Sequence, residues 1–86
     1  LLVSAGAAAA ADVPRAAVDA CLKHANAYAN VAPGTAKFNG DAQADVAWFT
    51  AAAGKNWRLH VEVPGSIALS CTVSPDGHRV AIEAAG

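Results

Sequence analysis

Two cysteines are the residues of this chain with the clearest chemistry. Cys21 and Cys71 are the only cysteines, and no C-x-x-C motif or Cys–His pair at metal-ligand spacing accompanies them. Neither has a second cysteine nearby that would resolve a redox intermediate. We therefore predict a structural disulfide between Cys21 and Cys71, which would stabilise the fold by roughly 4 kcal/mol. Two free, buried thiols are the alternative.

The histidines form no recognisable catalytic or metal-binding pattern. His24, His60 and His78 are scattered, and a metal site needs three or four converging ligands. Ser70, His60 and Asp45 would supply a Ser-His-Asp trio, but no G-x-S-x-G motif accompanies them. No P-loop and no G-x-G-x-x-G motif is present. We expect solvated or loosely hydrogen-bonded histidines, no metal, no cofactor and no enzymatic activity.

Two tryptophans are candidates for contacting a partner. Trp48 and Trp57 flank a turn, where they would pack into a small core or remain exposed as aromatic anchors. Arg58 and His60 follow Trp57 on what we expect to be the polar side of a strand. These four residues are the candidate partner-binding residues.

Composition limits the classes of function. The chain has 86 residues, enough for one domain, and a net charge of -1 with scattered lysines and arginines. This argues against binding to nucleic acid or lipid headgroups. Hydrophobic residues make up 55%, but many are alanines that bury little area, so a small core would benefit from a disulfide.

Residues 1–11, LLVSAGAAAAA, resemble the end of a secretory signal peptide. Ala9 and Ala11 fit the small-residue positions before a cleavage site, so the mature chain would start at Asp12. The segment is too short to span a bilayer, which takes roughly 20 residues. An alanine-rich helix, a disordered tail or a truncated membrane anchor are the alternatives. On the first interpretation, residues 12–86 form one domain in the periplasm or outside the cell, where disulfides form.

A helix is predicted to follow this segment. Asp12 is suited to cap it and Pro14 to its first turn, while Pro33-Gly34 should end it near Asn30. Apolar residues recur at three- and four-residue steps and would form one stripe. The stripe comprises Val18, Cys21, Leu22, Ala25, Tyr28 and Ala29.

The stretch from Trp57 to Val73 predicts a β-hairpin. Apolar and polar residues alternate over 57–63, Pro64-Gly65-Ser66 interrupts them, and the alternation resumes from Ile67. Ser74-Pro75-Asp76-Gly77 predicts another turn, and residues 78–83 a last strand. Upstream, we expect a short strand over 35–38, a turn at Asn39-Gly40-Asp41 and a strand over 45–52.

These elements predict an α+β domain. One N-terminal helix would pack on a four- to five-stranded antiparallel meander sheet, with the Cys21–Cys71 disulfide joining helix and sheet. The other face of the sheet should be wet. It would carry Arg58, His60, Glu62, Ser70, Thr72, Arg79 and Glu83.

The order of motifs resembles small bacterial PepSY-type domains and the helix-plus-meander modules of β-lactamase inhibitor proteins. The resembling segments, within residues 16–83, are AVDACLKHA, WRLHVEV and LSCTVSPDGHRVAIE. The cysteine pair and the length of residues 39–52 depart from the usual PepSY pattern. The resemblance implies a periplasmic or surface interaction module, in some cases one that inhibits an enzyme.

We therefore expect a non-catalytic, exported protein-binding module or an accessory subunit of a cell-envelope assembly, whose partner is another envelope or secreted protein. One alternative is a carrier of a small ligand or metal between helix and sheet. Another is an inhibitor of a secreted enzyme that presents Asn39-Gly40-Asp41 or Ser74-Pro75-Asp76-Gly77 as a rigid loop.

Overall fold

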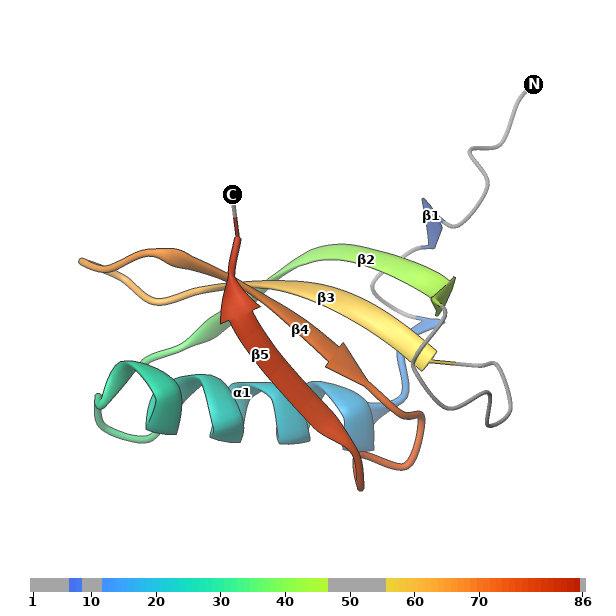
Figure 1. Ribbon diagram of the computed structural model, residues 1–86, viewed down its shortest axis with the longest axis horizontal. Helices are drawn as coiled ribbons and strands as arrows, with labels where there is room; N and C mark the ends of the chain where they lie inside the picture. Colours follow the sequence, from blue (N-terminus) through green and yellow to red (C-terminus); the bar gives the residue numbers. More distant parts are fainter. Residues whose placement is uncertain (1–6, 9–11, 47–55, 86) are drawn as a thin grey trace.

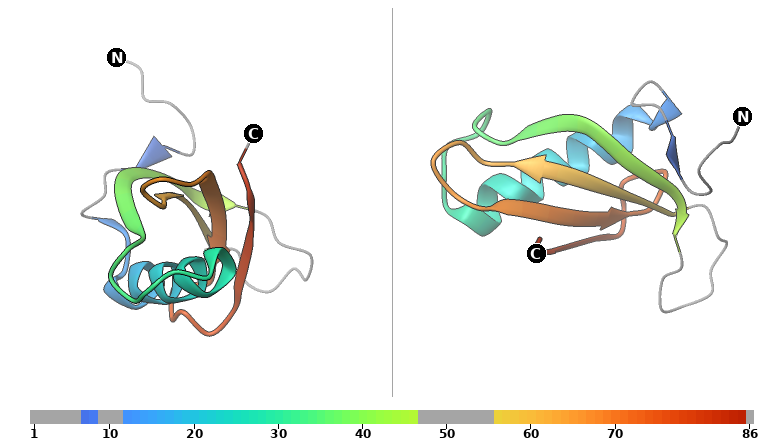
Figure 2. Two further views of the ribbon diagram at one scale, coloured as in Figure 1. Left: turned by 90° about the vertical axis from the view of Figure 1, so that its left-hand side faces the viewer. Right: turned by 90° about the horizontal axis from the view of Figure 1, so that it is seen from above.

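A single helix lies across one face of a curled antiparallel sheet (Figure 1; Figure 2). This computed structural model describes residues 7–8, 12–46 and 56–85. The strands pair in chain order, so every neighbour in the sheet is also a neighbour in sequence. The predicted fold class, a helix on an antiparallel meander sheet with a disulfide between them, is confirmed. The elements are β1 (Ala7–Ala8), α1 (Arg15–Ala29), β2 (Lys37–Val46), β3 (Asn56–Glu62), β4 (Ala68–Val73) and β5 (Val80–Ala84).

Helix α1 begins later than predicted and ends as predicted. Its N-cap is Pro14, and no side chain caps it, so the predicted capping role of Asp12 is wrong. The Pro14 carbonyl accepts the first helical hydrogen bonds, which leaves Asp12 too far upstream to reach the free N–H groups. Asn30 closes the helix in the left-handed conformation, with φ of 57°. Asparagine adopts this conformation more readily than most residues.

The buried face of α1 differs in part from the predicted stripe. Ala17, Cys21 and Ala25 are buried at four-residue steps, while Tyr28 is 53% exposed. Each four-residue step turns about 40° further round the helix, so the buried face moves toward Asn26 and away from Tyr28. Asn26 is not among the residues of the predicted stripe, but it is buried, and its side-chain oxygen accepts a hydrogen bond from the Ala36 N–H at 2.8 Å.

Strands β3 and β4 form the predicted hairpin. Leu59 pairs with Cys71 and Val61 with Leu69, and all four side chains are fully buried. The predicted turn is present, since the Ser66 N–H donates to the Val63 carbonyl. Ile67 precedes the first paired residue of β4 and is 54% exposed, so its expected place on the apolar face is wrong.

Strand β2 replaces the predicted short strand and turn around Asn39. It runs without a break from Lys37 to Val46, and its register against β3 shifts between Phe38 and Ala42. Gly40 has a φ of 91°, and the Asp41 N–H donates to the Asn39 side chain. The Asn-Gly-Asp sequence therefore forms a bulge within a strand and no hairpin turn. Most of the strand predicted over 45–52 lies outside the described residues, and its described part, 45–46, belongs to β2.

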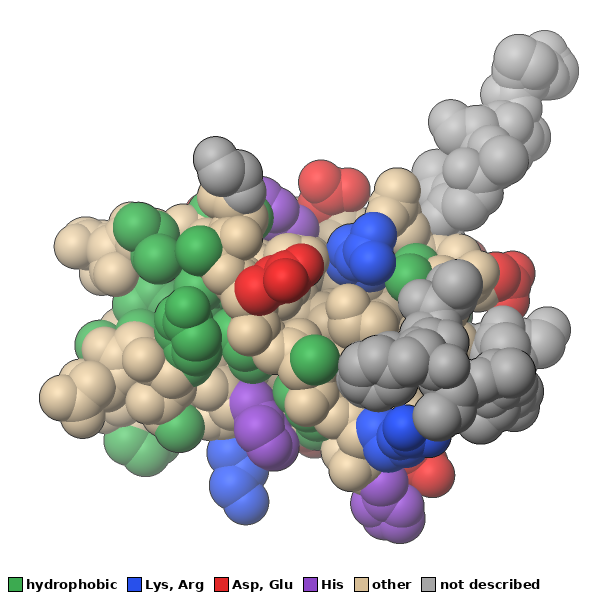
Figure 3. All heavy atoms as spheres, in the orientation of Figure 1, with side chains coloured by type: hydrophobic (Ala, Val, Ile, Leu, Met, Phe, Trp, Pro, Cys, Tyr) green, Lys and Arg blue, Asp and Glu red, His purple; other side chains and the backbone are tan. Residues whose placement is uncertain are grey.

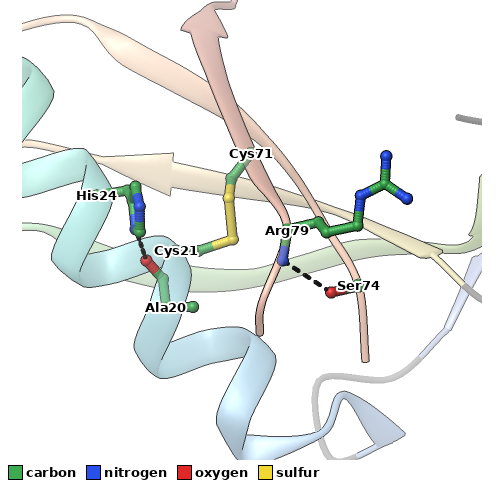
Figure 4. The surroundings of a disulfide bond; sticks show 6 residues. All are labelled: Ala20, Cys21, His24, Cys71, Ser74 and Arg79. Atoms are coloured by element: carbon green, nitrogen blue, oxygen red, sulfur yellow. Dashed lines mark hydrogen bonds between the residues drawn. A yellow bond between two sulfur atoms is a disulfide. The ribbon is translucent and has the colours of Figure 1, made fainter. Parts of the chain in front are cut away.

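The disulfide joins the middle of α1 to the middle of β4. Cys21 and Cys71 are bonded, their Cα atoms are 6.0 Å apart, and neither side chain is exposed (Figure 4). The bond therefore lies inside the core, between the helix and the inner face of the sheet. The buried apolar residues are Val13, Ala17, Cys21, Ala25, Ala36, Ala42, Leu59, Val61, Val63, Leu69, Cys71 and Val73.

The turn between β4 and β5 also packs against α1. Gly77 has a φ of +78°, and a Cβ atom placed there would lie 2.6 Å from the Ala16 carbonyl oxygen. The turn is fixed by its own polar groups, because the Ser74 hydroxyl and the His78 N–H both donate to the Asp76 carboxylate.

No helix in the described part of the chain has the length and apolar character that a membrane span requires.

Candidate functional site

The candidate site lies on the outer face of the sheet, which α1 does not cover (Figure 1). Successive side chains of a strand point to opposite faces, so residues between the core positions of β3 and β4 face outward. Arg58 pairs with Thr72, and His60 pairs with Ser70. Arg58 is exposed, and the other three are half-buried. The predicted polar face of the sheet is therefore present.

A shallow hollow of about 190 Å³ interrupts this face. The bulged part of β2 forms one side of the hollow, and β3 and β4 form its floor. Figure 3 shows basic, acidic and histidine side chains gathered along the upper side of the molecule, above β2 and β3. The lining residues are Asp41, Ala42, Gln43, Arg58, Leu59, His60, Ser70 and Ala85.

The lining offers both donors and acceptors. Arg58 contributes five guanidinium N–H groups, Asp41 a carboxylate, and Gln43 an amide that donates and accepts. Among the described residues, no hydrogen bond or ion pair engages the side chain of Arg58 or His60. Both side chains are thus available to a polar group of another molecule.

The four candidate partner-binding residues fall in different places. Arg58 and His60 line the hollow. Trp57 lies opposite Val73 and is half-buried against the core. Of the two alternatives for Trp57, core packing and an exposed anchor, the structure shows core packing. Trp48 lies outside the described residues.

The histidines lie apart. His24 Nδ1 donates to the Ala20 carbonyl at 2.9 Å on the surface of α1 (Figure 4), and His78 Nδ1 lies 3.3 Å from an Asp76 carboxylate oxygen. His60 lies in the hollow. Within residues 7–8, 12–46 and 56–85, no three histidine, cysteine, aspartate or glutamate side chains come together as metal ligands.

Asp76 lies outside the hollow, in the turn before β5. The N–H of His78 and the hydroxyl of Ser74 donate hydrogen bonds to Asp76, and they hold the pKa of its carboxyl below the ordinary value. The shift is explained by the turn itself, so it marks a local structural contact.

Sequence reasoning missed Asp41 and Gln43 as lining residues. Both lie on β2, and they reach the hollow because a bulge, and no turn, follows Phe38. The Asn-Gly-Asp sequence was the available signal, since a glycine with positive φ serves a bulge as well as a hairpin.

A second hollow, of about 400 Å³, lies at the tip of the β3–β4 hairpin. Its polar lining is limited to Lys37 and Glu62 on neighbouring strands and Ser66 in the turn. The rest is backbone and small or apolar side chains, including the exposed Ile67.

Comparisons with known proteins give this chain no relatives: no family model, no curated protein and no solved structure matches it. The resemblance to PepSY-type domains and β-lactamase inhibitor modules therefore stays a prediction.

Proposed function

We propose that this chain is a non-catalytic, exported protein-binding module, or an accessory subunit of a cell-envelope assembly, in the periplasm or outside the cell. Its partner is another protein, which contacts the outer face of the sheet around Arg58 and His60. The observation that carries this proposal is the division of the sheet into a face bonded to the helix and a polar face left uncovered.

The disulfide supports the compartment. Cytosolic thiols are kept reduced, whereas periplasmic and extracellular proteins keep their disulfides. A bond between Cys21 and Cys71 closes a loop with a sequence separation of 50 residues, and long loops gain the most from such closure. The signal-peptide-like residues 1–11 favour the same compartment.

The size of the outer hollow favours a protein partner over a small ligand. Small-molecule sites usually enclose about 300–1,000 Å³, and this hollow has about 190 Å³. It is large enough for a side chain of a partner. Arginine is enriched among the residues that dominate binding energy, which makes Arg58 the first residue to test.

A carrier of a small polar ligand is the second candidate. The mixed polar lining of the hollow favours it, because Asp41, Gln43 and Arg58 converge on one space. The two segments considered as inhibitor loops have different structures. Residues 39–41 are a bulge in β2 and form no loop, whereas residues 74–77 form a hydrogen-bonded turn in which Gly77 faces α1.

Site-specific crosslinking tests the binding surface. A photoreactive residue replaces Gln43 on the outer face or, as the matched control, Lys23 on the exposed side of α1. We expect a discrete crosslinked protein from position 43 in intact cells, none from position 23, and loss of the product when Arg58→Glu is added. Equal products from both positions would contradict the proposal.

Trapping the thiols at the moment of lysis tests the compartment separately. We expect both cysteines of the chain to be protected from alkylation until a reductant is added. Two thiols that react directly in the freshly lysed cells would contradict export.

A further inference from the structure

Strand β5 forms one edge of the sheet. It pairs with β4 on one side, and no described residue pairs with its other side. Residues 80–84 contain no proline, lysine or register shift, three of the usual means of preventing a sheet edge from pairing. The edge is therefore open to a further strand as far as the described residues go.

The hydrogen-bond pattern shows which backbone groups point outward. The Ser74 N–H donates to the Arg79 carbonyl, and the Ala85 N–H donates to the Ala68 carbonyl. In an antiparallel pair, hydrogen-bonded positions alternate along the strand, so Ala81 and Glu83 also point their backbone groups toward β4. The N–H and C=O groups of Val80 and Ile82 consequently point to the open edge.

The outward side chains of this edge carry opposite charges on the two sides of Ala81. Arg79, Ala81 and Glu83 are exposed and follow one another at two-residue spacing, so they share one face of the sheet. A cation and an anion thus lie at equal distances along the strand on either side of a small residue. A net charge of -1 adds little repulsion between two copies of the chain.

We propose that β5 pairs with β5 of a second copy of this chain, antiparallel, about a two-fold axis at Ala81. In this register Val80 faces Ile82 of the other copy, and their outward backbone groups form the new hydrogen bonds. Arg79 faces Glu83 of the other copy, twice by symmetry. Arg79 already has a contact within its own chain, and its guanidinium group has five donors, enough for more than one acceptor.

The neighbouring registers lack this match. A two-fold axis at Ile82 would place Glu83 opposite Ala81 and Arg79 opposite Ala85, so neither charge would meet its opposite. Opposite charges on facing strands stabilise pairing and like charges destabilise it. The charge pattern therefore selects the register centred on Ala81, and the sheets of the two copies become continuous through their β5 strands.

Sedimentation velocity of the oxidised full chain, over a wide range of concentration, tests this proposal. We expect the parent chain to dimerise. Arg79→Glu and Glu83→Arg each place like charges opposite one another twice, and each should weaken dimerisation about tenfold or more. The double variant Arg79→Glu/Glu83→Arg reverses both partners and should restore the parent affinity.

Glu62→Arg is the matched control, because it makes the same change of charge on β3, away from the edge. It should leave dimerisation unchanged, and circular dichroism should show all variants folded. A monomeric parent chain at every concentration would overturn the proposal. So would single variants that dimerise like the parent, or a folded double variant that does not recover. None of these three outcomes bears on the proposed binding surface around Arg58.

Discussion

The two faces of the sheet are built by the same strands and differ in what their side chains contact. On the inner face, Leu59 and Cys71 are fully buried against α1, and Cys71 is covalently bonded to it. On the outer face, the neighbouring residues Arg58 and His60 line a hollow. Their side chains form no hydrogen bond or ion pair with another described residue. The comparison teaches that strand alternation separates the core residues from the proposed recognition residues, so each set can be changed alone.

The largest expected effect comes from cutting the bond on the inner face. Cys21→Ala/Cys71→Ala removes the loop closure, and the free energy of unfolding should fall by about 4 kcal/mol. Denaturant titration of the variant and of the oxidised parent measures the difference. Addition of reductant to the unfolded parent, followed by refolding, should give the same loss; a stable reduced form would show that packing alone holds α1 on the sheet.

Substitutions at adjacent positions of β3 compare the two faces directly. Leu59→Ala leaves a cavity in the core and should cost about 3 kcal/mol. His60→Ala, one residue further on the outer face, should change stability by less than about 0.5 kcal/mol. Equilibrium unfolding of both variants in guanidinium chloride gives the comparison. Similar costs at the two positions would mean that the outer face also carries the fold.

The two tight turns of the sheet sharpen the comparison. Gly65 and Gly77 have φ of +79° and +78°, so replacement by alanine strains the backbone equally at both. A Cβ atom at Gly77 would also collide with the Ala16 carbonyl oxygen, while nothing lies within 4 Å at Gly65. Gly77→Ala should therefore lose about 2 kcal/mol more than Gly65→Ala, measured by thermal or denaturant unfolding.

The smallest effect concerns the turn before β5. The pKa of Asp76 is lower in the folded chain than in the unfolded one, because the His78 N–H and Ser74 hydroxyl bind its charged form. Its contribution to stability is therefore present at pH above the unfolded pKa and is lost as pH falls through the folded value. Unfolding measured against pH should show the parent more stable than Asp76→Ala at neutral pH, with the gap narrowing in acid. A gap independent of pH would exclude a role for the charge.

The sequence predicts the fold well where bulky apolar residues alternate strictly. Leu59, Val61, Leu69 and Cys71 share the buried face, which excludes a slip of one residue, and the turn after Val63 sets the pairing that is observed. Asn39-Gly40-Asp41 is different, because its residue types suit both a hairpin turn and a bulge. The pairing of β2 with β3 decides between them, and this is a contact distant in sequence.

The site was predictable only in part for the same reason. Arg58 and His60 follow from alternation along β3, but Asp41 and Gln43 join them only through the bulge. The core was also predictable only in part, because Tyr28 and Ile67 were expected on apolar faces and are exposed. Tyr28 is at the end of α1 and Ile67 just before β4. The apolar pattern of the sequence continues to both residues, but the core that would cover them does not, so both are exposed.

The most direct test of the division between the faces is the affinity of the crosslinked partner for two arginine variants. Arg58→Ala alters the outer hollow, and Arg15→Ala removes the same charge from the exposed side of α1, where it pairs with Asp19. We predict that Arg58→Ala weakens binding about tenfold or more, whereas Arg15→Ala binds as the parent does. Equal affinities for the two variants would contradict the account.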